Sequence, residues 1–446
     1  DIENRHGTLK LGGAVSARSD LSLQIELAGS GKTLLSQQCS PAEFASAGLT
    51  LTKLPIEPWW PNNLGSQTLY DLHIKLVDRE ATIFDHWQRR IGFKNIKWQL
   101  CEDSPENADP WLCRINGKQI FLQGVNWTPI RPNFADLQKK DYLTRLRSYK
   151  SMGVNLLRVW GGASLEKSCF YDLCDELGLM VWQELPLSSS GIENYPPDDA
   201  EMVEEYCTIM HSYILRRHHH ASLLLWCGGN ELTSVEGGPL GLDHPMLEKA
   251  DKLVREYDPQ HRFVPTSPTG PQYVAEMPNY GRGLHWDVHG PWKAAGNLDD
   301  KWRQYWQQDD ALFRSEVGAP GASDAEVIRR YAGECDTTPD KSNPLWRRTG
   351  WWLEIYQYLK ENSCESVILE DYVYWSQQRQ AKILRQAAES CKKRFPACGG
   401  IIIWMGHDSF PCTANTSIID FEGNPKPAVS ALAEVFLNCS SHYFIR

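Results

Sequence analysis

Two carboxylic acids, Glu231 and Glu316, follow apolar runs and are the residues of this chain best placed to do chemistry. Residues 223–229 read as a buried strand that closes in two glycines, and Asn230 and Glu231 come directly after it. Residues 311–316 end in the same way, at Glu316. In a barrel of alternating strands and helices, the carboxyl ends of the strands carry the chemistry. Two carboxylates on separate strand ends are what cleavage of a glycosidic bond requires.

Composition excludes several other classes of function. The chain has 446 residues, of which 41% are hydrophobic and 23% are charged, as in an ordinary globular protein of two or three domains. The net charge is −10 and the basic residues are scattered, so we expect neither a nucleic-acid partner nor a membrane surface. No apolar run reaches the roughly 20 residues that span a bilayer. The chain begins without Met or a signal peptide, so we expect a mature or excised product. Its compartment stays open between secreted, periplasmic and lysosomal-like.

The elements that must position these carboxylates change in kind along the chain. Short alternating apolar and polar runs predict an antiparallel β-sandwich over residues 1–101, with strands at 9–13, 21–27, 49–52 and 69–76. Strands then alternate with helices, which favours a closed (β/α)8 TIM barrel over residues 102–446. Helical patterns cover 141–152, 164–177, 198–217 and 370–395, and the long stretch before the last strand should carry an insertion over the site. The eight predicted barrel strands are 121–125, 156–159, 179–183, 223–229, 262–266, 284–288, 312–315 and 401–404.

Most of the predicted strands end in polar or aromatic residues, which is typical of a sugar-sized pocket at one rim of a barrel. Eighteen tryptophans are unusually many, and flat rings pack well against the faces of pyranose sugars. The candidate substrate-binding residues are Asn126, Trp127, Arg158, Trp160, Glu184, Asn230, His285, Trp286, His289, Trp404 and Asp408.

The same residues also allow structural interpretations. Glu231 and Glu316 could be ion-pair partners of neighbouring arginines. Glu184 could orient Arg158 rather than act on a substrate. Arg158 could keep Glu316 ionised, or it could only close an ion pair inside the barrel. Trp404 could form the floor of a pocket or part of the core.

We expect neither a metal ion nor an organic cofactor. The histidine triplet 218–220 looks like a metal motif, but adjacent side chains at a helix end point apart, and positive charge at a helix C-terminus is the simpler explanation. No cysteine pair or Cys/His spacing is typical of zinc. Thirteen cysteines is an odd number for a closed disulfide set, although Cys391 could pair with Cys398 or Cys412 in a secreted protein.

Several strings of residues resemble glycoside hydrolase family 2, most closely its β-mannosidase-like branch. They occur in the family's order and extend over about 58–430. The strings are 58–62 (PWWPN), 90–93 (RIGF), 124–127 (GVNW), 155–162 (NLLRVWGG), 170–178 (FYDLCDELG), 182–184 (WQE), 226–231 (WCGGNE) and 313–316 (FRSE).

The resemblance implies an immunoglobulin-like β-sandwich followed by a TIM barrel with a retaining, exo-acting β-glycosidase site. Glu231 would be the acid/base and Glu316 the nucleophile, with Asn230 bonded to the 2-hydroxyl group of a terminal β-linked sugar. The carbohydrate substrate would be a β-mannoside, and no cofactor would take part.

Two departures keep alternatives open. The family's N-terminal jelly-roll domain is not in this sequence, so a missing segment or another chain could supply it. Glu184 stands where β-mannosidases more often have Asp. We therefore also consider an exo-β-glucosaminidase, a β-galactosidase, a β-glucuronidase and a non-catalytic carbohydrate-binding relative. A metal-dependent hydrolase is disfavoured because no His-x-His follows the first predicted strand.

Overall fold

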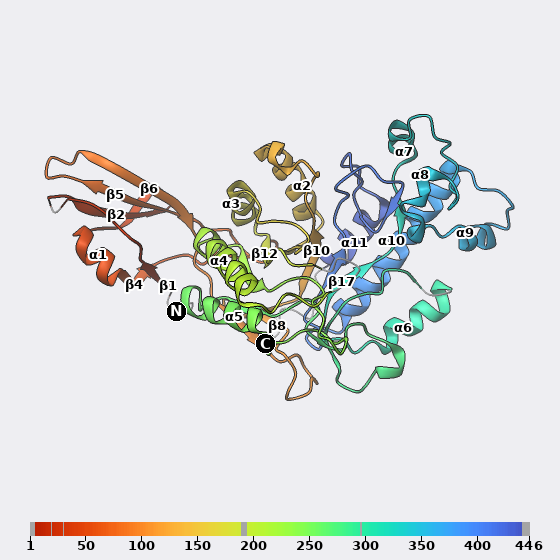
Figure 1. Cartoon of the computed structure of the whole chain (residues 1–446), viewed down its shortest axis with the longest axis horizontal. Coiled ribbons are helices and arrows are strands. Elements are labelled where there is room, and N and C mark those ends of the chain that lie inside the picture. The colour runs from red at the N-terminus through yellow and green to blue at the C-terminus, as the bar shows by residue number, and fades with distance from the viewer. Residues whose placement is uncertain (1–4, 19, 30, 189–193, 295–296, 439–446) are drawn as a thin grey trace.

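The structure of the chain is a computed structural model that describes residues 5–18, 20–29, 31–188, 194–294 and 297–438. Figure 1 shows an elongated molecule, with a β domain at one end, the barrel in the middle and a group of short helices at the other end. No helix within the described part of the chain is both long and apolar enough to cross a membrane.

The N-terminal domain is the predicted β-sandwich. An antiparallel sheet of order β3-β2-β5-β6 faces the pair β1-β4, and Ile25, Leu27 and Leu72 are buried between them. Edge strands β3 and β6 were not predicted, because most of β6 is exposed on both faces and so shows no apolar alternation. The elements are β1 (His6–Leu11), β2 (Ser22–Gly29), β3 (Lys32–Cys39), α1 (Pro41–Ala47), β4 (Leu49–Pro55), β5 (Tyr70–Val77) and β6 (Ile83–Ile91).

A small antiparallel sheet connects the sandwich to the barrel. It contains β7 (Ile96–Gln99), β8 (Leu112–Ile115) and β9 (Lys118–Ile120). Trp111, just before β8, stacks on Trp182 and Phe313 of the barrel strands, at ring-centroid distances of 5.7 and 4.8 Å. This sheet takes strands from both sides of the predicted boundary between residues 101 and 102, and that boundary stays a prediction.

Each of the eight predicted barrel strands has a counterpart in the strongly curled main sheet, whose order is β14-β13-β12-β11-β10-β19-β17-β16-β15. All pairings in it are parallel except that of the short β15, which runs antiparallel to β16. The strands are β10 (Leu122–Trp127), β11 (Leu156–Val159), β12 (Met180–Glu184), β13 (Leu223–Cys227), β14 (Arg262–Val264), β15 (Gly270–Pro271), β16 (His285–Val288), β17 (Phe313–Gly318) and β19 (Gly400–Trp404).

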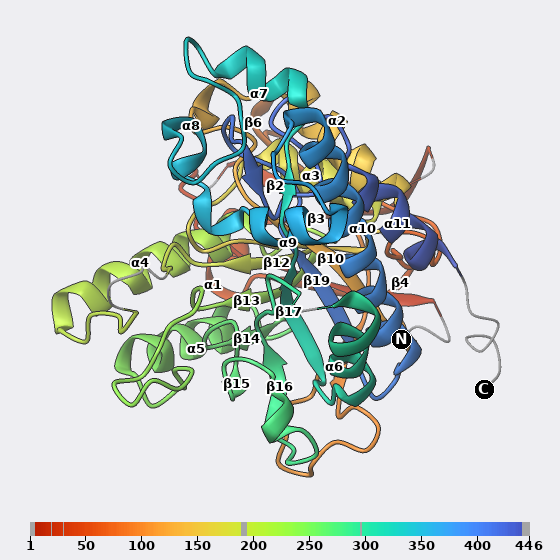
Figure 2. The same cartoon turned by 90° about the vertical axis from the view of Figure 1, so that its right-hand side faces the viewer.

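Helices cover the outside of the curled sheet. In Figure 2, α4 and α5 lie on one side of the strands and α10 and α11 on the other. Helix α10 buries one face along its length, including Ile383, Leu384 and Ala387 against the barrel core. The helices are α2 (Lys139–Ser151), α3 (Ser168–Leu177), α4 (Ala200–Arg217), α5 (Pro245–Tyr257), α6 (Arg303–Gln308), α10 (Leu369–Lys393) and α11 (Pro427–Leu437).

Two findings refine the predicted elements. Helix α3 begins four residues after the predicted position 164, because the preceding Glu166 turns inward and accepts hydrogen bonds from Trp127 and Tyr142. The stretch between β17 and β19 carries the expected insertion, with β18 (Gly321–Ala322), α7 (Ala325–Tyr331), α8 (Pro344–Arg347) and α9 (Ile355–Asn362). Strand β18 pairs with β20 (Ala414–Asn415).

Candidate active site

Glu231, His289 and Glu316 meet at the carboxyl ends of the barrel strands. Glu231 follows β13, His289 follows β16, and Glu316 lies in β17. One carboxylate oxygen from each glutamate and one ring nitrogen of His289 all lie within 4.8 Å of one another. The two predicted carboxylates therefore face the same small volume.

The backbone around Glu231 explains the two glycines ahead of it. A Cβ atom on Gly228 would lie 2.3 Å from the carbonyl oxygen of Pro265, and one on Gly229 would lie 2.8 Å from that of Leu187. Only glycine fits between these two backbones. Glu231 itself has a φ of 55°, a left-handed conformation that costs a non-glycine residue free energy. Its N–H donates to the carbonyl oxygen of Ser267 at 2.7 Å, which holds this conformation.

Arg158 is the centre of the polar network beneath the two carboxylates. Its guanidinium is fully buried and donates to Glu316 at 2.7 Å, to Glu184 at 2.9 Å, and to the amide oxygens of Asn126 and Asn230 at 2.6 Å each. Residues from four different strand ends are thus hydrogen-bonded to the one side chain of Arg158.

Glu184 completes this network from the side away from Glu316. It is 1% exposed, and its second oxygen accepts the N–H of Gly161 at 2.6 Å. Both its oxygens are therefore occupied by protein donors. These contacts agree with the structural interpretation, in which Glu184 orients Arg158.

Glu316 accepts two donors, Arg158 on one oxygen and the indole N–H of Trp292 on the other at 3.1 Å. Burial raises the pKa of Glu316 to about 8, Arg158 opposes this shift, and the nearby Glu231 adds to it. Two carboxyl groups this close titrate as a pair, so the pair keeps one proton through neutral pH.

His289 lies between the two carboxylates. Its Nδ1 is 2.9 Å from Glu231 and 3.6 Å from Glu316, while its Nε2 is 3.0 Å from the Ser267 hydroxyl. Burial lowers the pKa of His289 to about 4, so the imidazole is neutral at neutral pH. Burial likewise raises the pKa of Tyr273, and a hydrogen bond to Glu231 adds to that shift.

The structure brings together most of the predicted site residues. Asn126, Arg158, Glu184, Asn230 and His289 join the two glutamates in one connected network. Trp160 and Trp404 form an edge-to-face pair, with ring centroids 5.6 Å apart, at the ends of β11 and β19. Both rings are partly exposed.

Four predicted residues have other partners than the two carboxylates among the interactions of the described residues. Trp127 packs among Tyr142, Phe170 and His407, on the helix-covered side of β10. His285 begins β16 and lies 2.6 Å from Asp310, and Trp286 donates to the carbonyl oxygen of Gly283. Asp408 is fully buried and accepts a hydrogen bond from Asn415.

Sequence reasoning missed Ser267, Tyr273 and Trp292, which contact the cluster. It also missed Asp287 and Ser315, which are connected to the cluster through Ser267. Trp292 follows a Gly-Pro pair just after β16, which is a usable signal for a turn at the strand end. Tyr273 comes from the segment around β15, a strand whose antiparallel pairing has no signature in the sequence.

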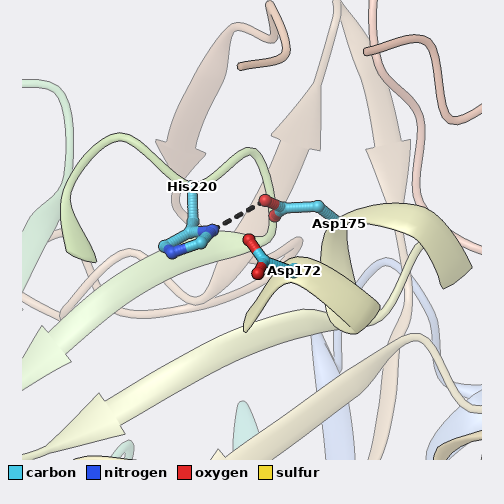
Figure 3. Close-up of side chains that lie close together, drawn as sticks. All are labelled: Asp172, Asp175 and His220. Atoms are coloured by element: carbon cyan, nitrogen blue, oxygen red, sulfur yellow. Dashed lines mark hydrogen bonds and ion pairs between the residues drawn. The ribbon is translucent and has the colours of Figure 1, made fainter. Parts of the chain in front are cut away.

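Two groups of side chains among the described residues have the spacing of metal ligands. One is Glu231, His289 and Glu316, and the other is Asp172, Asp175 and His220. Figure 3 shows the second group, in which His220 points at Asp175 from the segment before β13. Of the histidine triplet 218–220, His220 is the residue that joins such a group. The cysteines within the described ranges are free thiols, Cys391, Cys398 and Cys412 among them.

Comparison with known proteins places this architecture in a family. The model of the "Glycosyl hydrolases family 2, TIM barrel domain" matches residues 110–265, and a second "Glycosyl hydrolases family 2" model matches residues 3–94. Together they cover more than half of the chain and leave the connection between sandwich and barrel between them.

Individual relatives agree with these matches. Beta-mannosidase B of Aspergillus clavatus is 28% identical over 95% of this chain and 50% of its own length, and that of Emericella nidulans is 28% identical over 84% and 46%. The crystal structure of a beta-D-mannosidase from Dictyoglomus thermophilum has the same fold, with a TM-score of 0.77 and 23% identity over 97% of this chain and 55% of that one. The chain thus spans about half the length of the curated relatives that it matches. On these matches and the sandwich–barrel architecture, the chain belongs to family 2 of the glycosyl hydrolases.

Proposed function

We propose that this chain is the catalytic part of a retaining exo-β-glycosidase that hydrolyses terminal β-linked sugars, with β-mannosides as the preferred substrates. One observation carries the proposal: Glu231 and Glu316 face each other with carboxylate oxygens within 4.8 Å. Carboxyl groups about 5–5.5 Å apart act on one anomeric carbon without room for an intervening water, whereas inverting enzymes separate them by about 6.5–9.5 Å.

In the first step, Glu231 protonates the glycosidic oxygen while Glu316 attacks the anomeric carbon. The bond to the leaving group breaks, and a covalent glycosyl-enzyme forms on Glu316. The donors Arg158 and Trp292 stabilise the Glu316 carboxylate before the attack. In the second step, Glu231 accepts a proton from water, whose oxygen attacks the anomeric carbon and releases Glu316.

Asn230 is oriented to help in both steps. Arg158 donates to its amide oxygen at 2.6 Å, so the amide NH2 group points the other way, with Ser188 Oγ 3.3 Å from it. A side chain fixed in this orientation can donate to the sugar 2-hydroxyl group. Such a hydrogen bond strengthens as positive charge develops at the anomeric carbon.

The choice of β-mannosides rests on the names of the curated relatives, Beta-mannosidase B. The geometry of the two carboxylates is common to β-glycosidases of any sugar.

A panel of 4-nitrophenyl β-glycosides tests the substrate, measured on this chain and on a longer one of the relatives' length. We expect the β-mannoside to give the highest kcat/KM. A higher value for the glucosaminide, galactoside or glucuronide would replace the mannoside. Sugar binding by calorimetry without hydrolysis over days would instead indicate a non-catalytic carbohydrate-binding protein.

A pair of variants tests the mechanism. Glu231→Ala should lose activity on substrates with poor leaving groups but keep activity on 2,4-dinitrophenyl glycosides, which need no acid. Glu316→Gln should be inactive on both. A 2-deoxy-2-fluoro glycosyl fluoride should label Glu316, as located by peptide mass. Equal residual activity of the two variants, or label on another residue, would contradict the assigned roles.

A further inference from the structure

A line of hydrogen bonds connects Glu231 with a buried carboxylate, Asp287, that the proposed mechanism does not use. The Ser315 hydroxyl donates to Asp287 at 2.6 Å, and the Ser267 hydroxyl donates to Ser315 at 2.9 Å. His289 Nε2 lies 3.0 Å from the Ser267 hydroxyl, and His289 Nδ1 lies 2.9 Å from Glu231. All of these links are short enough to be full hydrogen bonds.

Asp287 is the acceptor end of this line. It is fully buried in β16, and its two oxygens also accept the backbone N–H groups of Ser315 at 3.2 Å and Thr269 at 3.1 Å. Three donors and no acceptor thus point at one carboxylate. Burial raises the pKa of Asp287 to about 7, while the hydrogen bonds and the charge of Arg158 lower it.

The direction of each hydrogen bond follows from counting hydrogens. Ser315 uses its one hydroxyl hydrogen on Asp287, so it can only accept from Ser267. Ser267 then uses its hydrogen on Ser315, so it can only accept from His289. The Nε2 atom of His289 must therefore carry a hydrogen. A neutral imidazole has only one N–H, so its Nδ1 is an acceptor, and the hydrogen between Nδ1 and Glu231 must belong to Glu231.

We propose that Asp287, acting through Ser315 and Ser267, is a positioning residue that fixes the tautomer of His289 and thereby keeps the proton of the carboxylate pair on Glu231. This inference rests on the proposed function, because it explains how one of two neighbouring glutamates becomes the acid. The surroundings of Glu316 agree with it: Arg158 and Trp292 both donate to that carboxylate, which is the pattern an ionised group requires.

Other groups near His289 are compatible with this arrangement. Glu316 lies 3.6 Å from Nδ1, the rings of Tyr273 and Trp292 lie 5.9 and 6.4 Å away, and the charge of Arg158 disfavours a protonated imidazole. None of these groups donates a hydrogen to Nδ1 among the interactions of the described residues. Glu231 is therefore the group that donates a hydrogen to Nδ1 of His289.

The variant Ser267→Ala removes the hydroxyl group that joins Ser315 to His289, and it leaves both glutamates in place. His289 can then move its hydrogen to Nδ1 and donate to an ionised Glu231, so the acid loses its proton at lower pH. We expect the alkaline limb of the kcat/KM profile to shift down by about one pH unit. At pH 7 we expect about a tenfold loss on a methyl or 4-methoxyphenyl glycoside and no more than about a twofold loss on the 2,4-dinitrophenyl glycoside.

The control is Ser267→Thr, which keeps the hydroxyl group and should restore the wild-type pH profile. Ser315→Ala removes a different link of the line and should reproduce the effects of Ser267→Ala, including where the latter folds poorly. Equal losses on both classes of substrate with an unchanged alkaline limb would overturn the proposal, because that pattern indicates packing alone.

The tautomer can be read without a substrate. In protein labelled with 15N-histidine, the ring signals of His289, assigned by their loss in His289→Gln, should show Nε2–H in the wild type and a change in Ser267→Ala. An Nδ1–H tautomer in the wild type would overturn the proposal even if the enzyme is an active glycosidase. Failure to hydrolyse any glycoside would contradict the proposed function but not this result.

Discussion

Two clusters of the same composition lie at opposite ends of β13. The lower cluster, Asp172, Asp175 and His220, lies before or beside its start. The upper cluster, Glu231, His289 and Glu316, lies beyond its end. Each cluster has two carboxyl groups and one histidine within 4.8 Å, and Figure 3 shows the first. By residue type and spacing alone, both would be candidates for chemistry.

Their hydrogen bonds make the clusters different. Asp175 accepts the N–H of Ser222 and pairs with His220, both at 2.7 Å, and both side chains of this pair are only 2% exposed. Its carbonyl oxygen also accepts the indole N–H of Trp59 from the N-terminal domain. The carboxylate of Asp175 is therefore occupied within the barrel, and its carbonyl oxygen connects the barrel to the N-terminal domain.

The upper cluster is held together by hydrogen bonds between side chains and is partly exposed to solvent. The Glu231 side chain is 20% exposed, and the groups holding it and Glu316 converge from different strand ends. In TIM barrels the carboxyl ends of the strands carry function and the amino ends carry stability. Position on the strand and use of hydrogen bonds, rather than composition, distinguish the candidate site from the structural cluster.

The largest expected difference between the clusters is in turnover. Glu316→Gln should lower kcat by at least about 10⁴-fold, because it removes the proposed nucleophile. Its melting temperature should change less than that of Asp175→Ala, because the glutamine amide oxygen can still accept a hydrogen bond from Arg158 or Trp292. Calorimetry and hydrolysis of a 4-nitrophenyl glycoside check both. A loss of activity smaller than about a hundredfold would contradict the assignment.

The reverse pattern is expected for Asp175→Ala. It should lower the free energy of unfolding by about 3–5 kcal/mol, because the N–H of Ser222 and the ring of His220 lose their buried partner. Below the unfolding transition, kcat/KM should stay within about twofold of the wild type. A specific loss of activity in a stable variant would instead assign chemistry to the lower cluster.

The pH dependence of stability should reveal the upper cluster. Burial raises the pKa of Glu316 from 4.5 to about 8, and because Glu316 and Glu231 titrate as a pair, the folded pair keeps one proton that the unfolded chain has released. Stability from this pair is complete below about pH 4.5 and is lost as the pH rises toward 8, with a slope of at most about 1.4 kcal/mol per pH unit. Melting temperatures measured from pH 5 to 8 should fall less in Glu316→Gln than in the wild type. Parallel curves would refute this effect.

A smaller effect is expected when one donor to Glu316 is removed. Trp292→Phe keeps an aromatic ring but loses the indole N–H at 3.1 Å from Glu316. We expect kcat/KM to fall about tenfold, which corresponds to about 1.4 kcal/mol, a reasonable value for one hydrogen bond to a charged group. An unchanged kcat/KM would show that Arg158 alone is sufficient to hold this carboxylate.

The smallest effect should come from Asp172→Asn in the lower cluster. Asp172 is only partly buried, and Figure 3 marks no hydrogen bond or ion pair from it to the two residues beside it. Unfolding free energy and kcat/KM should both remain close to the wild type, within about 0.5 kcal/mol for stability. A destabilisation as large as that of Asp175→Ala would show that the three residues act as a unit.

The sequence predicted the order of domains and the barrel strands because apolar runs of strand length, closed by glycines and followed by helical patterns, are local features. It also indicated Glu231 and Glu316, since both stand where such a run ends. Edge strands β3 and β6 were not predicted, because strands that are largely exposed lack a run or alternation of apolar residues.

The sequence could not determine which strand residues face the cavity. Neighbouring residues of a strand point to opposite faces, and a strand buried on both faces shows no alternation to tell them apart. Asn126 therefore contacts Arg158 inside the barrel, whereas the adjacent Trp127 packs beneath the helices. His285 and Asp408 likewise lie at the predicted strands but have other partners.

The sequence alone was thus sufficient to predict the two carboxylates at strand ends, the eight barrel strands and the likeness to a family. That Arg158 binds Glu184 and Glu316 together, and that Asp287 reaches Glu231 through two serines and a histidine, was decided only by the tertiary structure. The reason is that these contacts join residues from four or more strands, and the register and curvature of the sheet set their distances, which no local pattern of side chains encodes.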